Sequence, residues 1–344
     1  MIQFLQHLVN GLSLGTIYAL IALGYTMVYG VLKLINFAHG DVYMVGAFAG
    51  YYLAGTLGVR DQPSFWKAVA VTLGSMVVCG VLGFAIERFA YRPLRHRARL
   101  TALITAIGIS FLLEYGFQLP SLQEQGRTLA RWVDDRGYVV PALSAAVPRL
   151  PAEFPPGPTP RLFPELLERK DWTFFHSEAP DGTVTDLRIS NFDLIGLGVA
   201  FGLMLGLQWI VYRTRFGRAM RAVSFDPQVA GLMGIPVNRI ISWTFVLGSA
   251  LAAAAGIINA TSRYRIEPLF GLMSGLKAFV AAVLGGIGSV PGAMVGGLVL
   301  GLAEEFVAGY TESSYRDAIA FAVLIVVLLF RPEGLFGRAR VEKV

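Results

Sequence analysis

Six stretches of this sequence lack Asp, Glu, Lys and Arg altogether, and they limit the possible folds more than any other feature. The stretches are 4–32, 42–59, 68–86, 194–212, 240–262 and 278–303. A helix that crosses a bilayer needs roughly 20 apolar residues, whereas a helix on the surface of a soluble protein keeps a polar face. Charged residues form 15 % of the chain, against about 25 % in a soluble domain. The sequence therefore predicts an all-α integral membrane protein.

Glycine and proline interrupt the last of these stretches. The interrupting residues are Gly285, Gly286, Gly288, Pro291 and Gly292. A membrane tolerates such a break only where the backbone faces protein or a water-lined cavity. We expect one helix on each side of the break, over 276–287 and 291–306, and a short final span over 319–330. The prediction is a polytopic bundle of about eight or nine transmembrane helices with broken or re-entrant segments.

Three connecting segments are rich in arginine, and they set the orientation. The segments 87–99, 213–239 and 331–343 hold many more basic than acidic residues. Basic residues near the ends of spans are retained in the cytoplasm. We therefore expect a multi-pass protein of the bacterial inner (plasma) membrane with a cytoplasmic C-terminus. The net charge of +6 lies in these short loops, so no nucleic-acid partner is expected.

This orientation divides the chain into three parts. Residues 1–119 form N-terminal transmembrane helices, 120–190 form an extracytoplasmic proline-rich insertion, and 191–344 form C-terminal transmembrane helices with a cytoplasmic loop over 213–240. The insertion holds ten of the 17 prolines of the chain. Proline-rich chain is extended and lacks internal hydrogen bonds, so we expect a small lobe with few regular elements.

A polar hexapeptide separates the first two spans. It contains Asn36, His39, Gly40 and Asp41. One interpretation is a cytoplasmic turn in which Asn36 or Asp41 caps the next helix. The other is a helix break beside a polar path through the bundle, because polar groups within a membrane are costly and tend to be functional. The residues alone leave both open.

Glycines spaced by four form ridges along several spans. They are Gly11 and Gly15; Gly46 and Gly50; Gly198, Gly202 and Gly206; Gly292 and Gly296; and Gly297 and Gly301. Small residues on one helix face let two backbones approach closely in a membrane. These ridges predict tight packing of the helices in the bundle.

The loop 213–240 contains a helix signal of its own. Ser224 or Asp226 can cap a helix that begins at Pro227, since proline suits the first helical turn. This helix is expected to end at Gly234. It is either a docking element for a partner or a solvated connector. The residues expected to matter are Arg218, Arg221, Ser224, Asp226, Val229, Leu232, Met233 and Gly234.

Four charged residues, Glu114, Lys277, Glu304 and Glu305, interrupt apolar runs. Snorkelling to the interface is one explanation. The other is that Lys277 pairs with an acid across the bundle.

The chain lacks the motifs of an enzyme. There is no G-x-x-x-x-G-K-[ST] loop for ATP, no H-E-x-x-H and no G-x-S-x-G, and the four histidines show no ligand spacing. We expect no catalytic site, no metal and no cofactor in this chain.

Several segments resemble one known family, the branched-chain amino-acid ABC permeases of the LivH type. They read GLSLGTIYALIALGYTMVYG from Gly11, INFAHGDVYM from Ile35, ERFAYRPL from Glu87 and GLKAFVAAVLGGIGSVPGAM from Gly275. About three quarters of the chain resembles this family. The segment 119–188 is longer and richer in proline than the resemblance leads us to expect.

The resemblance implies a function and a set of partners. It implies the permease subunit of an importer that carries leucine, isoleucine and valine by alternating access. A second permease subunit, cytoplasmic ATPase subunits that bind ATP and Mg²⁺, and a periplasmic binding protein would complete the complex. The loop at 221–236 would couple to the ATPase. Alternatives are a permease of the same family for urea, short amides or other amino acids, and an ion-coupled secondary transporter.

Overall fold

The computed structural model describes residues 2–59, 61–95, 97–134, 154–178 and 184–337. Within these ranges, six helices are long and apolar enough to cross a membrane. They are α1 (Ile2–Leu32), α3 (Phe65–Ala85, continued by η1, Ile86–Tyr91, and η2, Arg92–Leu94), α4 (Arg99–Gln118), α7 (Asn191–Arg213), α10 (Val237–Arg263) and α12 (Val290–Tyr310). The predicted all-α polytopic membrane fold is confirmed.

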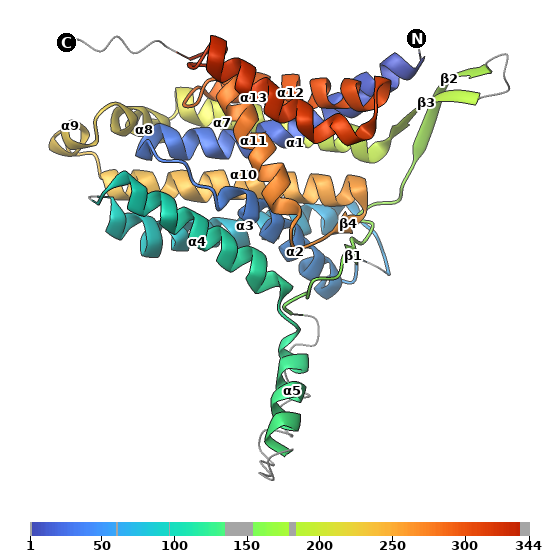
Figure 1. Cartoon of the computed structure of the whole chain (residues 1–344), viewed down its shortest axis with the longest axis horizontal. Coiled ribbons are helices and arrows are strands. Elements are labelled where there is room, and N and C mark those ends of the chain that lie inside the picture. Colours follow the sequence, from blue (N-terminus) through green and yellow to red (C-terminus); the bar gives the residue numbers. More distant parts are fainter. Residues whose placement is uncertain (1, 60, 96, 135–153, 179–183, 338–344) are drawn as a thin grey trace.

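Three shorter helices complete the bundle. They are α2 (His39–Thr56), α11 (Phe270–Gly285) and α13 (Arg316–Phe330), the last preceded by η4 (Ser313–Tyr315). Figure 1 shows them beside the long helices, with α11 between α12 and α10. Whether these three cross the bilayer fully stays a prediction.

The centre of the bundle is formed by α1 and α10, and glycines bring their neighbours close. A Cβ added to Gly301 of α12 would lie 2.3 Å from the Cα of Gly15 on α1. A Cβ on Gly46 of α2 would lie 2.5 Å from the Cα of Ala253 on α10. Packing through small residues is therefore confirmed at these ridges. It is wrong for Gly198, Gly202 and Gly206 of α7, because a Cβ on any of them would meet no described atom within 4 Å.

The glycine-rich break separates α11 from α12. α11 ends at Gly285, and Gly286 and Gly288 then have φ angles of +101° and +98°, which favour glycine. The Ser289 hydroxyl accepts a hydrogen bond from the Gly292 amide and caps α12. A Cβ on Gly285 would lie 2.0 Å from the carbonyl oxygen of Gly292. The predicted break is confirmed, although α11 begins at Phe270, six positions before the expected start, because the apolar pattern continues upstream.

Contacts from the connecting segments agree with the expected topology. The Arg188 amide donates to the side chain of Gln6 near the start of α1, and the Ser224 hydroxyl donates to the Gly30 carbonyl near its end. Figure 1 shows α8 (Arg215–Phe225) and α9 (Pro227–Leu232) at one end of the bundle and the β2–β3 hairpin at the other. The helices α8 and α9 and the β2–β3 hairpin therefore lie at opposite ends of the bundle.

The segment 120–190 contains more regular structure than expected. It holds the helix α5 (Leu122–Asp134), the antiparallel hairpin of β2 (Asp171–Glu178) and β3 (Val184–Ser190), and β1 (Arg161–Leu162), which pairs with β4 (Arg265–Ile266). Figure 1 shows α5 leading away from the bundle. Residues 135–153, with three of its prolines, lie outside the described residues.

Candidate functional site

An ion-pair network joins α11, α12 and α13. The ammonium group of Lys277 lies 2.7 Å from Glu304 Oε1 and 2.6 Å from Asp317 Oδ1. Lys277 and Glu304 are only 6 % and 1 % exposed. Snorkelling is therefore the wrong explanation for both residues, and pairing across the bundle is confirmed. Glu114 on α4 is also buried, at 2 % exposure.

This network lines a cavity of about 710 Å³ between α1, α10, α11, α12 and α13. The Tyr18 hydroxyl donates to Glu304 Oε2 across the cavity, with 2.8 Å between the oxygens. The apolar part of the wall consists of Leu14, Ile17, Leu269, Phe270 and Met273. We refer to this space as the polar cavity.

The polar cavity also contains a positively charged side chain that has no partner among the described residues. Arg263 lines it at the end of α10. Among the described residues, the Arg263 guanidinium has no ion pair and no hydrogen bond, whereas Arg316 bonds to Glu305 with 3.0 Å between Nη2 and Oε2. The Asn259 amide lies one turn before Arg263 and lines the same wall. The cavity thus offers fixed positive groups, fixed carboxylates and an apolar wall.

This arrangement can bind a small zwitterion with an apolar side chain. A guanidinium binds a carboxylate through two parallel hydrogen bonds, and the exposed Asp317 carboxylate can accept from an ammonium group. Binding pockets for small molecules measure about 300–1,000 Å³ and combine apolar walls with a few placed polar groups. Among the described residues, no three His, Cys, Asp or Glu side chains gather as metal ligands would.

The polar hexapeptide lies outside the lining of this cavity. Asn36 is buried, and its side-chain oxygen accepts from the Tyr91 hydroxyl at 2.9 Å. His39 is buried against the Tyr25 ring, with 4.9 Å between the ring centroids. Gly40 packs on α11, where a Cβ would lie 2.7 Å from the Gly271 carbonyl oxygen. These residues join α1, α2, α11 and η1, and their role in a pathway stays a prediction.

Asp41 connects α2 to α4. It accepts a hydrogen bond from the Ser110 hydroxyl and faces the carboxyl group of Glu114. The capping interpretation is wrong, because α2 begins after Ala38 without a side-chain cap from Asn36 or Asp41. The cap was one of two open interpretations, because a polar residue flanks an apolar run; the Asn36 and Asp41 side chains bond to neighbouring helices instead.

The loop 213–240 forms two short helices at the end of the bundle. Asp226 caps α9 by accepting from the amides of Gln228 and Val229, at 2.8 and 3.0 Å. α9 spans Pro227–Leu232, and Gly234 follows with a φ of +80°. Of the two caps expected, Asp226 is therefore confirmed, whereas the Ser224 hydroxyl is used by the Gly30 carbonyl.

An apolar patch surrounds α9. Phe225, Leu232, Met233 and Val229 are 92 %, 87 %, 78 % and 54 % exposed. We refer to these four side chains as the α9 patch. The exposed Arg218 lies on the adjoining α8, while the Arg221 guanidinium donates to the Val211 carbonyl and lies over the Tyr212 ring. The patch is unlike a solvated connector, whose exposed residues are polar.

Sequence reasoning singled out Lys277 and Glu304 but missed Tyr18, Asn259, Arg263 and Asp317. Asn259 and Arg263 are four residues apart on α10, so they share a helix face. That spacing was the available signal. Arg263 and Asp317 each lie at the edge of a span, where charge is ordinary, so neither stands out in the sequence.

Comparisons with known proteins agree with one another. A family model described as branched-chain amino acid transport system / permease component matches residues 7–328. The permease LivH of Escherichia coli K12 is 41 % identical over 344 residues, covering 100 % of this chain and 98 % of that protein. BraD of Pseudomonas aeruginosa is 42 % identical over 345 residues, covering 99 % and 98 %. Both are named as high-affinity branched-chain amino acid transport permeases.

The chain and these relatives cover each other almost entirely. The greater length and proline content of residues 119–188 stay a prediction. Among solved structures, PsaBC of Streptococcus pneumoniae in complex with Fab matches with a TM-score of 0.44 and 15 % identity, covering 97 % of this chain and 94 % of that one.

Proposed function

This chain belongs to the family of branched-chain amino acid permeases, and from that membership we propose that it imports leucine, isoleucine and valine as one permease subunit of an ABC transporter. A separate ATPase subunit supplies the energy, and the helix bundle alternates its opening between the two faces of the membrane. The chain itself performs no hydrolysis.

The polar cavity supports this proposal most directly. Arg263 is free to bind the substrate carboxylate, and the Asp317 carboxylate at 54 % exposure is accessible to the ammonium group. Phe270 and Met273 offer an apolar surface for the branched side chain. Urea and short amides carry neither charge, so this cavity favours an amino acid over them.

The α9 patch supports the coupling to an ATPase. Four large apolar side chains are exposed on α9 and directly beside it, beyond the end of the spans. A helix of this kind suits insertion into a groove of a partner. The arginines of η1 and η2 lie at the same end, where Arg95 donates to the Asn238 side chain. Basic segments are retained in the cytoplasm, which is where the ATPase would be.

The remaining partners follow from the same orientation. The C-terminus is cytoplasmic and the membrane is the bacterial inner membrane. The opposite face, with α5 and the β2–β3 hairpin, meets a periplasmic binding protein that delivers substrate to the polar cavity. A second permease subunit completes the pathway.

The test is uptake by the complex that copurifies with a tagged form of this chain, reconstituted into proteoliposomes with its binding protein. We expect ATP-dependent uptake of labelled leucine, competed by isoleucine and valine and unaffected by ionophores. Uptake driven by an ion gradient without ATP would support a secondary transporter instead. Competition by urea but not by valine would assign the chain a different substrate.

The orientation has its own test. In a Cys79→Ala background, Gln228→Cys on α9 and Thr128→Cys on α5 each replace an exposed residue with a cysteine. An impermeant maleimide added to intact cells should label only the cysteine at 128. Labelling of the cysteine at 228 from outside would reverse the orientation.

A further inference from the structure

A long groove runs between α3 and α10 on the outer surface of the bundle, away from the polar cavity. It has a volume of about 1,070 Å³. Its walls are apolar over most of their length, with Val77, Val81 and Phe84 from α3 and Trp243, Val246 and Ala250 from α10. We refer to it as the α3–α10 groove.

One end of the groove is strongly basic. Arg88 and Arg92 from η1 and η2, and Arg239 from the start of α10, line this end. Arg92 is committed, because it pairs with Glu87 at 3.2 Å and donates to the Ser242 hydroxyl at 2.9 Å. Arg88 and Arg239 are exposed and have no acidic partner in the described part of the chain. Two unneutralised guanidinium groups therefore flank the mouth of an apolar channel.

The dimensions of the groove match one leaflet of a bilayer. Leu73 and Arg88 both line it, and at about 1.5 Å per residue the helix between them measures roughly 22 Å. One leaflet, with its headgroup region, contributes about half of the roughly 40–45 Å thickness of a bilayer. The basic end lies at the depth of the headgroups, because the adjoining segment 92–98 leaves the span there.

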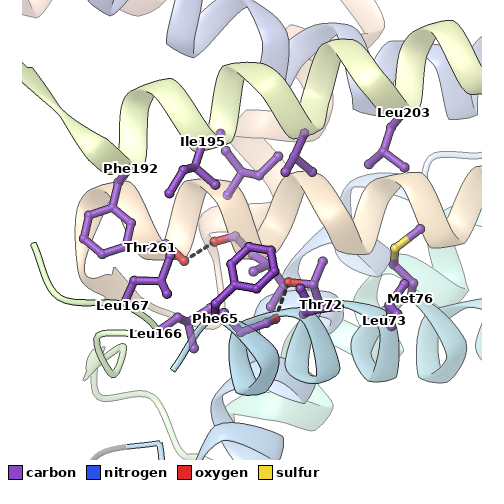
Figure 2. Close-up of a pocket in the computed structure, with 16 residues that line it drawn as sticks. Phe65, Thr72, Leu73, Met76, Leu166, Leu167, Phe192, Ile195, Leu203 and Thr261 are labelled. Carbon is purple, nitrogen blue, oxygen red and sulfur yellow. Dashed lines mark hydrogen bonds between the residues drawn. The ribbon is translucent and has the colours of Figure 1, made fainter. Parts of the chain in front are cut away.

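The groove continues into a second apolar space. A crevice of about 280 Å³ between α3 and α7 shares Leu73 and Met76 with it. Figure 2 shows Met76 of α3 and Leu203 of α7 on opposite sides of this crevice, whose walls are almost entirely apolar. An acyl chain that enters from the basic end therefore meets continuous apolar surface.

We propose that the α3–α10 groove is a binding site for an anionic phospholipid, with its phosphate held by Arg88 and Arg239 and an acyl chain along α3. Arginine is well suited to phosphate because its planar group donates two parallel hydrogen bonds. A second copy of the chain is a weaker candidate for covering the groove. If the grooves of two copies faced each other, the arginines of both would lie near one another or against bare apolar surface. The site is independent of the proposed transport function.

Trp243 provides a native reporter, because it lines the groove and is 57 % exposed. The other four tryptophans, Trp66, Trp132, Trp172 and Trp209, are replaced by phenylalanine. The fluorescence of Trp243 is then measured in vesicles that contain either phosphatidylglycerol or phosphatidylcholine with brominated acyl chains, at equal mole fractions. Bromine quenches tryptophan only at close range.

We expect Trp243 to be quenched preferentially by the brominated phosphatidylglycerol. Near a membrane each basic residue contributes about fivefold to the affinity for an anionic lipid. Arg88→Gln/Arg239→Gln should therefore reduce the preference by about 25-fold or abolish it. The control is Arg213→Gln/Arg215→Gln, which removes two exposed arginines outside the groove, and it should retain the preference.

Three outcomes would overturn the proposal. Equal quenching by the two lipids would mean that the groove contacts ordinary bilayer lipid without selection. Quenching by neither would mean that protein covers the groove, as a second subunit would. An equal loss of preference in the Arg213/Arg215 control would mean that total charge, and not this groove, attracts the lipid. A normal circular dichroism spectrum of each variant checks that the bundle is folded.

Discussion

The ammonium group of Lys277 on α11 lies 2.7 Å from Glu304 Oε1 on α12, and both side chains are buried in the bundle. The two helices are joined by the glycine turn at 286–288, which brings together residues that are 27 positions apart. Removing one partner of a buried pair is costly because it leaves an unpaired charge in a medium of low polarity.

Lys277→Met should therefore lower the free energy of unfolding by about 3–5 kcal/mol. Lys277→Met/Glu304→Gln should lose less than the sum of the two single variants, because it leaves no buried charge unpaired; Asp317, the other partner of Lys277, is 54 % exposed and can be hydrated. Unfolding by a denaturing detergent, followed by circular dichroism, measures all three. Strictly additive losses would mean that the two side chains do not interact.

Gly40→Ala should destabilise the bundle by about 1–3 kcal/mol, the usual cost of forcing an extra carbon into a packed core. The new Cβ would lie 2.7 Å from the Gly271 carbonyl oxygen and 2.8 Å from the Gly275 Cα, so α2 and α11 must separate. Gly202→Ala on α7 is the control, since its Cβ would meet nothing within 4 Å. The melting temperature in detergent should fall for the first variant only, and an equal melting temperature for both would contradict the packing account of the hexapeptide.

Leu232→Asp should detach the ATPase subunit. An anchor in a desolvated interface commonly contributes about 2 kcal/mol or more, which corresponds to roughly 30-fold in affinity. The amount of ATPase that copurifies with tagged permease is the measurement. Leu335→Asp is the control, because it introduces the same charge at another exposed leucine beyond the spans. Unchanged copurification and unchanged substrate-stimulated hydrolysis in Leu232→Asp would show that α9 only connects α8 to α10.

The spans could be predicted from the sequence because lack of charge over about 20 residues is a local property. The same holds for the break at Gly285–Gly292 and for the cap at Asp226, since both depend on backbone geometry within a few residues. The partner of Lys277 could not be predicted. It depends on how α11 folds back on α12, and the sequence offers several acids at span ends.

The residues that line the polar cavity could not be predicted from local sequence patterns, for a further reason. Arg263 is the last residue of α10 and Asp317 the second of α13, positions where charge is common. Only the close packing of α1 with α12 brings Tyr18 to Glu304 and closes the wall around them. Conversely, Asn36 and Asp41 looked like caps in sequence, but their partners Tyr91 and Ser110 lie 55 and 69 positions away.

The measurement that tests the polar cavity most directly is the number of leucine molecules imported per ATP hydrolysed by reconstituted Arg263→Gln complex. Loss of a hydrogen bond to a charged group costs about 1.5–3 kcal/mol. We therefore predict that the number of leucine molecules imported per ATP falls roughly 10- to 100-fold. Hydrolysis stimulated by the binding protein should persist. Arg331→Gln, an exposed arginine after α13 and outside the cavity, serves as the control and should leave the ratio unchanged. A wild-type ratio in Arg263→Gln would contradict the assignment of this cavity as the substrate site.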